Sequence, residues 1–190
     1  RNKRAIFVSE KVSQVTLSRK AMIVARETYV NRLSRSRGNG LIKIVTGLRR
    51  SGKSFLLKTL FRNHLIDNGV ADDHIIIIDM ESRKNKAFKD PDFLLDRIDE
   101  LMVDSSTYHI IIDEVQEVND FVEVLSSLAV MEGTDVYVTG SNSRFLSSDV
   151  VTEFRGRGDE IHVWPLSFRE YMSAYDGSKE DGWAEYLTYG

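Results

Sequence analysis

The chain has 190 residues, of which 42% are hydrophobic and 29% charged, and it contains no cysteine. This length suits about one domain with a sizeable core, and the absence of cysteine excludes a disulfide framework and thiol chemistry. The formal net charge of −3 gives no overall argument for a nucleic-acid-binding surface. Because no apolar run approaches the ~20 residues of a membrane span and no secretory signal pattern appears at the start, we expect a cytoplasmic protein with no membrane partner.

Residues 1–36 are predicted to form an N-terminal segment and a helix. Six of the first 20 residues are Lys or Arg, and only Glu10 is acidic. A solvated surface segment, a nucleic-acid-binding arm and an appended non-native segment are all compatible with this pattern, and we favour the first. The apolar residues of 22–33 recur at helical spacing, and the Gly- and Ser-rich stretch 35–40 predicts a turn into the first strand.

Residues 47–54 match the phosphate-binding pattern G-x-x-x-x-G-K-[ST]. A predicted strand (41–46) precedes this loop and a predicted helix (53–67) follows it, which is the context that the motif requires. A glycine turn with an incidental Lys-Ser is the alternative, and the strand–loop–helix context argues against it.

Each fixed position of this loop has a physical role. Gly47 and Gly52 allow backbone conformations that turn successive N–H groups toward phosphate oxygens, and the helix N-terminus adds partial positive charge there. The ammonium of Lys53 would lie against the β- and γ-phosphates, and the hydroxyl of Ser54 would ligate Mg²⁺.

The predicted nucleotide-binding residues are the loop and the residue after it: Gly47, Leu48, Arg49, Arg50, Ser51, Gly52, Lys53, Ser54 and Phe55. For the two arginines of this loop, two interpretations are open. They touch phosphate, or they face a neighbouring subunit or domain.

After the loop, apolar strands alternate with amphipathic helices. Strands are predicted at 74–79, 108–112, 135–138 and 160–164, and the four consecutive isoleucines of the first suit a strand buried on both faces. Three helix starts are predicted from capping residues: Asp90 before Pro91, Asn119 before a helix that runs to Met131 and ends at Gly133, and the capping box of Ser167 and Glu170.

This alternation predicts an α/β fold with a parallel sheet of about five strands and helices on both faces. We expect a P-loop ATPase core over 37–165 and the start of a helical subdomain over 166–190, whose aromatic residues pack together. In such sheets, ligands gather at the carboxyl ends of the strands, so catalytic partners of the loop should lie at other strand ends.

Asp113 and Glu114 follow the apolar strand 108–112 directly. Asp113 fits the Mg²⁺ position, and Glu114 fits the base that orients and polarises a water for attack on the γ-phosphate. Acids after an apolar strand are common, so surface acids leaving a strand are the alternative when this motif stands alone. A glutamate beside the metal ligand favours hydrolysis over transfer to a substrate hydroxyl.

The identity of the nucleotide base is predicted from the absence of a guanine-recognition motif. GTP specificity usually needs an Asn-Lys-x-Asp reader, and residues 85–88 (Asn-Lys-Ala-Phe) lack its aspartate, so we expect ATP.

Polar residues after the strand 135–138 are candidate contacts of the γ-phosphate or the attacking water: Thr139, Ser141 and Asn142. A strand-to-helix turn in which Ser141 or Asn142 only caps the helix is the alternative. Arg155 or Arg157 would serve as an arginine finger, or would be a solvated surface arginine. The four histidines show no metal-binding spacing and are expected to be structural.

The motifs occur in a fixed order, at 47–54, 112–118, 139–143, 156–157 and 164–171. Together they resemble the prokaryotic AAA-type ATPases that carry an uncharacterised, nuclease-like C-terminal domain. The resemblance covers about residues 22–190 and implies that Lys53 and Ser54 form the Walker A pair, and Asp113 and Glu114 the Walker B pair. It also implies that Ser141 and Asn142 lie at sensor 1.

By the same resemblance, Arg157 is the candidate finger or sensor arginine. Phe55 departs from the family, which usually has a small hydroxylic residue there, and residues 1–20 match no known pattern. The family's C-terminal domain would be expected to follow residue 190.

We therefore expect an ATPase with ATP and Mg²⁺ as cofactors, in which Lys53, Glu114, Asn142 and Arg157 act on the reacting phosphate and Ser54 and Asp113 hold the metal. A nucleotide-dependent interaction switch with little turnover is the second hypothesis, and a DNA-directed motor or accessory ATPase the third. Expected partners are ATP or ADP, further copies of the chain or a C-terminal domain in cis, and a macromolecule, of which DNA is one candidate.

Overall fold

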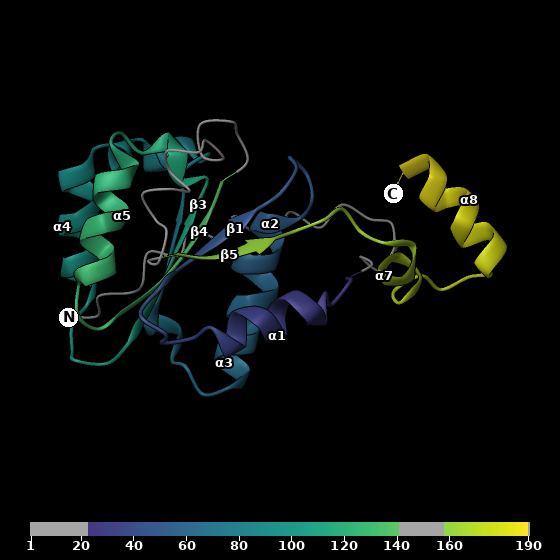
Figure 1. Cartoon of the computed structure of the whole chain (residues 1–190), viewed down its shortest axis with the longest axis horizontal. Helices are drawn as coiled ribbons and strands as arrows, with labels where there is room; N and C mark the ends of the chain where they lie inside the picture. The colour runs from purple at the N-terminus through teal and green to yellow at the C-terminus, as the bar shows by residue number, and fades with distance from the viewer. Residues whose placement is uncertain (1–22, 141–157, 190) are drawn as a thin grey trace.

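The computed structural model describes residues 23–140 and 158–189, and its centre is a five-stranded sheet (Figure 1). The strands lie in the order β2-β3-β4-β1-β5, and every neighbouring pair is parallel. Their bounds are β1 (Ile42–Thr46), β2 (Ile75–Asp79), β3 (Tyr108–Asp113), β4 (Thr134–Thr139) and β5 (Gly158–His162). The parallel five-stranded sheet predicted from the sequence is confirmed.

Helices cover both faces of the sheet. Helices α4 (Pro91–Leu101) and α5 (Phe121–Val130) lie on one face, and α1 (Glu27–Arg35) packs on the other with one continuous helical segment, 53–67. That segment consists of α2 (Lys53–Phe55), a π-helical stretch η1 (Leu56–Phe61) and α3 (Arg62–Asp67). Short 3₁₀ turns complete the connections: η2 (Asp72–His74), η3 (Arg83–Lys89) and η4 (Val115–Glu117).

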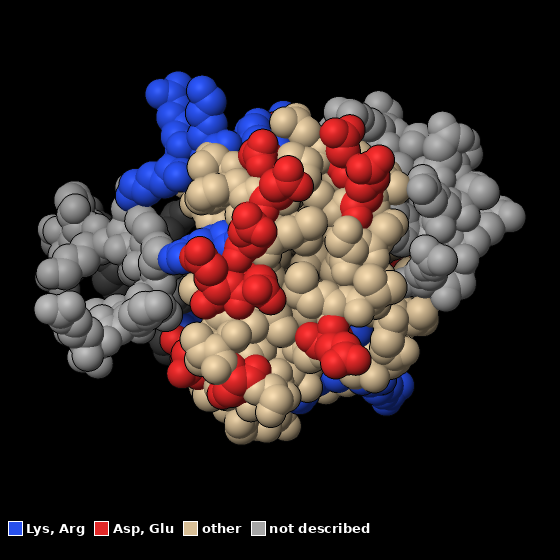
Figure 2. All heavy atoms as spheres, turned by 90° about the vertical axis from the view of Figure 1, so that its left-hand side faces the viewer, with Lys and Arg blue, Asp and Glu red and all other residues tan. Residues whose placement is uncertain are grey.

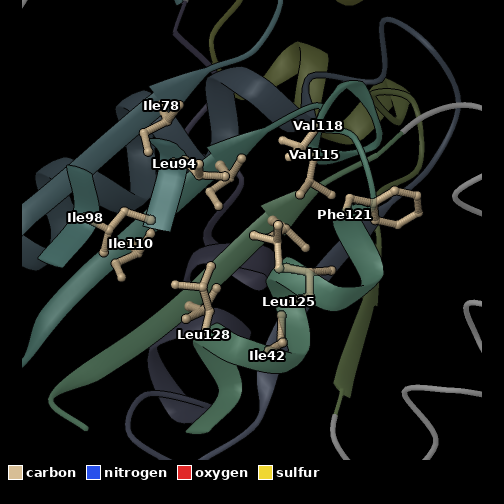
Figure 3. Close-up of a cluster of buried hydrophobic side chains, with 14 of the residues drawn as sticks. Ile42, Ile78, Leu94, Ile98, Ile110, Val115, Val118, Phe121, Leu125 and Leu128 are labelled. Atoms are coloured by element: carbon tan, nitrogen blue, oxygen red, sulfur yellow. The ribbon is translucent and has the colours of Figure 1, made fainter. Parts of the chain in front are cut away.

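The sheet separates two hydrophobic cores because side chains alternate along each strand. Ile110 and Ile112 of β3 pack with Leu94 and Ile98 of α4 and with the apolar face of α5 (Figure 3). Ile111, between those two isoleucines, points to the other face and packs with residues of α1 and of the segment 53–67. The central strand β3 is buried along its whole length, as its apolar sequence predicts.

The edge strand β2 differs from the prediction. Ile76 and Ile78 are buried against α4, whereas Ile75 and Ile77 are only partly buried. The run of four isoleucines was expected to lie in a strand buried on both faces. As an edge strand, β2 has no neighbour on one side and incomplete cover on one face.

Most element boundaries agree with the sequence to within one residue, and the larger differences concern α1, β5 and the start of α5. Helix α1 begins at Glu27, five residues after the predicted start, and β5 ends at His162 rather than at residue 164. Asn119 does not cap α5: the residue before that helix is Asp120, which has a left-handed backbone and no side-chain capping bond. The N–H of Asn119 donates instead to the carbonyl of Lys89 at 3.0 Å, which ties the start of α5 to the end of η3.

The predicted caps of α4 and α7 are confirmed. The carboxylate of Asp90 accepts a hydrogen bond from the N–H of Phe93, and Ser167 and Glu170 form the reciprocal capping box at the start of α7 (Phe168–Met172). Helix α7 and the following α8 (Lys179–Tyr189) extend away from the sheet in Figure 1. Phe168 lies 4.9 Å from Trp183 between ring centroids, so aromatic side chains pack these two helices together as expected.

Charge is unevenly distributed over the face that carries α4 and α5. Figure 2 shows Asp and Glu side chains across this face and Lys and Arg side chains gathered at one of its upper corners. Within the two described ranges, no helix is both long enough and apolar enough to span a bilayer.

Candidate nucleotide-binding site

The phosphate loop leaves β1 at Gly47 and enters α2 at Lys53, so it lies at the carboxyl end of the central strands. Gly47 has φ 137°, and a Cβ added there would lie 2.2 Å from the carbonyl oxygen of Val163. Gly52 has φ 90°, a left-handed conformation that other residues rarely adopt. Both glycines of the motif are thus required by the backbone path, one by close approach and both by conformation.

Lys53 is held beneath the loop by the loop's own carbonyl groups. Its ammonium donates to the carbonyl oxygens of Gly47 at 3.1 Å and Leu48 at 2.9 Å, and the residue is buried. Burial lowers the pKa of Lys53, although Glu114 and then Asp113 act in the opposite direction. A phosphate group brought to this ammonium would supply the negative charge that the loop itself lacks.

The two arginines of the phosphate loop, for which two interpretations were open, lie on its exposed side. Leu48, Arg49, Arg50 and Phe55 are exposed, whereas Ser54 is half-buried beside Lys53 at the start of α2. The Ser51 hydroxyl is buried and has no hydrogen-bond partner. Such an orphaned donor in a loop with inward-turned backbone is the kind of group that a bound anion satisfies.

Arg26 ties the phosphate loop to the C-terminal helices, a connection that the sequence did not reveal. Its guanidinium donates to the carbonyl oxygens of Ser51 at 2.8 Å and Trp164 at 2.7 Å, and it pairs with Glu170 Oε1 at 3.2 Å. The side chain is almost fully buried and stacks over the ring of Tyr29. These contacts join residues 138 and 144 positions apart, so no local sequence pattern could have indicated them.

Asp113 ends β3 and is buried, so it is not one of the surface acids considered as the alternative. The Thr139 hydroxyl at the end of β4 donates to Asp113 Oδ1 at 2.7 Å. The same Thr139 oxygen accepts the N–H of Glu114 at 2.8 Å. The sequence suggested Thr139 as a contact of the γ-phosphate. In the structure its hydroxyl is hydrogen-bonded to the Asp113 carboxylate and to the Glu114 N–H.

Lys58 contacts Asp113 from the other side. Its ammonium lies 2.7 Å from Asp113 Oδ2 and 2.9 Å from Asp79 Oδ2, the aspartate that ends the neighbouring strand β2. Burial acts to lower the pKa of Lys58, but the hydrogen bonds that its ammonium donates to Asp113 and Asp79 outweigh it and raise the pKa above its ordinary value. Both residues were missed: Asp79 also ends an apolar strand, and Lys58 lies four residues after Ser54, which would have signalled a shared helix face.

Glu114 adopts a left-handed backbone with φ 58°, which is uncommon for a residue with a side chain. The bond from its N–H to Thr139 stabilises this conformation, and its carboxylate accepts a hydrogen bond from the Gln116 side chain. Backbone strain of this kind costs about 1–3 kcal/mol and persists where the surroundings enforce it. Here one contact fixes the backbone of Glu114 and the other fixes its half-buried carboxylate.

The remaining candidates lie outside the described residues: Ser141, Asn142, Arg155 and Arg157. Among the residues that are described, the structure brings together Lys53, Asp113 and Glu114 at the carboxyl ends of the strands, with Ser54 next to Lys53 in the sequence. Carboxylate and hydroxyl oxygens are the donors that Mg²⁺ prefers, and a loop of backbone N–H groups beside a lysine suits a nucleotide's phosphates. The donor set therefore fits a nucleotide with a divalent cation.

A parallel sheet of this order, with a glycine loop between strand β1 and the helix that follows it, defines an AAA-type P-loop NTPase. Comparison with known proteins extends this class to a family. Residues 39–172 match the family model described as AAA domain, and the chain belongs to that family.

One relative and two solved structures illustrate the likeness. An uncharacterised protein of Haemophilus influenzae is 35% identical over 177 residues, which covers 90% of this chain but only 44% of the relative. The Aeropyrum pernix ORC1 protein, solved in complex with DNA, has a TM-score of 0.55 and 13% identity over 86% of this chain and 50% of its own. PCH-2 of C. elegans has a TM-score of 0.52 and 22% identity, over 77% of this chain and 44% of its own. The two structures support the fold alone.

Proposed function

We propose that this domain binds ATP with Mg²⁺ and hydrolyses it by attack of water on the γ-phosphate. The observation that carries the proposal is the pair of acids at the end of β3, since one hydroxyl, that of Thr139, contacts both Asp113 and the backbone of Glu114. Membership of the AAA domain family and the phosphate loop support nucleotide binding.

The chain's own residues divide the work as follows. Lys53 and the backbone N–H groups of the loop bind the phosphates, and Ser54 and Asp113 would hold the metal. Bound Mg²⁺ would neutralise charge that develops on the phosphate oxygens. Glu114 orients a water and accepts its proton. Asn142 would contact the γ-phosphate or the water, and Arg157 would act as the finger; neither lies in the described ranges.

The test is phosphate release from ATP with Mg²⁺, measured for the wild type and for Glu114→Gln. The variant keeps the size of the side chain but removes the base, and we expect turnover to fall by about 10²–10⁴-fold. Glu117→Gln is the matched control, because Glu117 is exposed and pairs only with Lys89 at 2.8 Å in the contacts observed. Equal hydrolysis by Glu114→Gln and the wild type would contradict the mechanism.

Repeating the assay over a range of protein concentrations addresses the oligomeric state. A specific activity that rises with concentration would indicate an arginine supplied by a second copy. A constant specific activity with clear turnover would indicate that one copy suffices.

A nucleotide-dependent switch is the second candidate function. The exposed Arg49 and Arg50 favour it, because they place two positive charges on the outer side of the phosphate loop, where a partner could contact them. Slow turnover together with nucleotide that stays bound through purification would support the switch over the ATPase.

A DNA-directed function has one supporting observation. Arg83, Lys84 and Lys86 of η3 are exposed, and none of the ion pairs found among the described residues involves them. Arg83 and Lys86 line an open hollow of about 890 Å³ beside β2, together with Lys89. Two glutamates, Glu81 and Glu117, also line it, which limits the positive potential.

Binding of labelled duplex DNA at several salt concentrations tests this function. Alanine at all three exposed positions of η3 should weaken binding and reduce its salt dependence, because each lost phosphate contact lowers the slope. Deletion of residues 1–20 is the parallel variant for the basic N-terminal segment. Absence of binding by the wild type at low salt would exclude this candidate.

We propose that the whole protein has activities or partners that this domain alone does not provide. The chain spans less than half the length of the Haemophilus relative, so partners of that longer protein are not defined by this domain. A nuclease-like C-terminal domain acting in cis is the partner implied by the family resemblance.

A further inference from the structure

The strand ends beside the phosphate loop carry two carboxylates and one resident cation. Asp79 and Asp113 end neighbouring strands and are register partners in the β2–β3 pair. Two adjacent carboxylates repel each other, more strongly when one is buried, and the Asp113 side chain is 2% exposed. The Lys58 ammonium contacts Asp79 at 2.9 Å and Asp113 at 2.7 Å and so offsets half of this charge.

Lys58 also occupies the side of Asp113 that a metal would need. Asp113 Oδ1 already accepts the Thr139 hydroxyl, and Asp113 Oδ2 accepts the lysine. The lysine lies within the π-helical stretch η1, on the same continuous helix as Ser54, and its side chain is 27% exposed. It is thus held by the two acids and at the same time partly exposed to solvent.

We propose that Lys58 is the counter-cation of the Asp79–Asp113 pair in the nucleotide-free site, so that the divalent cation binds together with the nucleotide rather than before it. Lys58 and the metal compete for Asp113. A nucleotide changes the balance because its phosphates add ligands for the metal that the protein alone does not supply. The inference rests on the proposed function in one respect, the assignment of Asp113 as a metal ligand.

Binding of Mn²⁺ without nucleotide tests the proposal directly, since free Mn²⁺ is counted by its electron paramagnetic resonance signal. Lys58→Met removes the ammonium and keeps a flexible apolar side chain of similar length. We expect this variant to bind Mn²⁺ alone more tightly than the wild type, by about tenfold or more. Lys58→Arg, which keeps the positive charge, should bind Mn²⁺ as weakly as the wild type.

Two further variants control for general effects. Arg62 lies one turn after Lys58 on the same helix and pairs with Asp72. Arg62→Met therefore removes a positive charge near Lys58, and it should leave Mn²⁺ binding unchanged. Adding Asp113→Asn to Lys58→Met should abolish the gained site, because it removes the buried ligand. If Lys58→Met does not fold, Lys58→Gln replaces it, since it also removes the positive charge and keeps a polar side chain.

The proposal is overturned if the folded Lys58 variant binds Mn²⁺ no more tightly than the wild type. If the Mn²⁺ binding gained by Lys58→Met persists after Asp113→Asn is added, the assignment of Asp113 as a metal ligand is overturned instead. Neither result depends on hydrolysis, because no nucleotide is present. A failure of the Glu114→Gln assay would therefore contradict the proposed ATPase and leave the Mn²⁺ result standing.

Discussion

The sheet carries a lysine–aspartate centre at each end, and the two centres use the same chemistry in different surroundings. The amino-end centre consists of Lys43 and Asp135 with His109 and Tyr137, and the carboxyl-end centre consists of Lys58, Asp79 and Asp113. In the first, the Lys43 and Asp135 side chains are 0% and 2% exposed. In the second, the Lys58 and Asp79 side chains are 27% and 37% exposed.

The partners differ as well. Besides the Lys43 ammonium, Asp135 accepts the Tyr137 hydroxyl at 2.7 Å and the N–H of Gly38 at 3.2 Å, and His109 Nδ1 lies 3.3 Å away. This buried network joins the starts of three strands, β1, β3 and β4. The carboxyl-end centre borders solvent, because its Lys58 and Asp79 side chains are partly exposed. We call a fully buried ion pair closed, and such a pair supports the fold. We call an ion pair that borders solvent open, and such a pair can exchange its cation.

Asp135→Asn should produce the largest loss of stability. The substitution leaves the Lys43 charge buried without its counter-ion, and breaking a buried pair in this way costs about 3–5 kcal/mol. The free energy of unfolding, measured in urea by circular dichroism, checks this value. The matched variant at the other centre is Asp79→Asn, and equal losses for the two would refute the distinction between a closed and an open centre.

The stability difference between the wild type and Asp135→Asn should depend on pH. Burial acts to raise the pKa of Asp135, but the neighbouring His109 ring and the hydrogen bonds from Lys43 and Tyr137 outweigh it and lower the pKa to about 2. A lowered carboxyl pKa contributes stability above the unfolded-state value near ~4, and this contribution is lost as the pH falls toward the folded-state value.

The difference should therefore narrow by about 2 kcal/mol between pH 7 and pH 2, and most of that change falls below pH 4. Urea unfolding of both proteins at pH 7, 4, 3 and 2 measures it. A difference that stays constant over this range would show that Asp135 does not ionise differently in the folded and unfolded states.

Thr139→Val should affect both stability and activity at the carboxyl-end centre. The isosteric valine leaves Asp113 Oδ1 without its donor and Glu114 N–H without its acceptor, which costs about 1–3 kcal/mol. Turnover should also fall by about 10–100-fold, because the acids lose the contact that orients them. Thr139→Ser keeps the hydroxyl and is the control. If valine and serine variants hydrolyse ATP equally, Thr139 does not position the acids.

The sequence predicted the parts of this site that depend on local pattern. The phosphate loop has fixed spacing, and the acids Asp113 and Glu114 follow an apolar strand, so both could be found without coordinates. The same reasoning placed strands β2 and β3, because each contains a run of consecutive isoleucines.

The rest depends on contacts between distant residues. Arg26 reaches Glu170 across 144 positions, and Thr139 reaches Asp113 across 26, so only the folded chain shows these pairs. The misplaced cap at Asn119 has a similar cause, since its backbone is engaged by Lys89 in another element. Local capping preferences are worth about 1 kcal/mol, and a tertiary contact can override them.

Asp79→Asn should have the smallest effect of these substitutions. Asp79 is partly exposed, and Lys58 keeps its contact with Asp113, so we expect a loss of about 0–1 kcal/mol. Asp72→Asn, which removes the acid of an exposed pair with Arg62, gives the scale of an ordinary surface ion pair. Urea unfolding of both variants should show similar small losses. A loss well above that of Asp72→Asn would mean that Asp79 is needed to hold Lys58 in place, and the carboxyl-end centre would then be as closed as the one around Asp135.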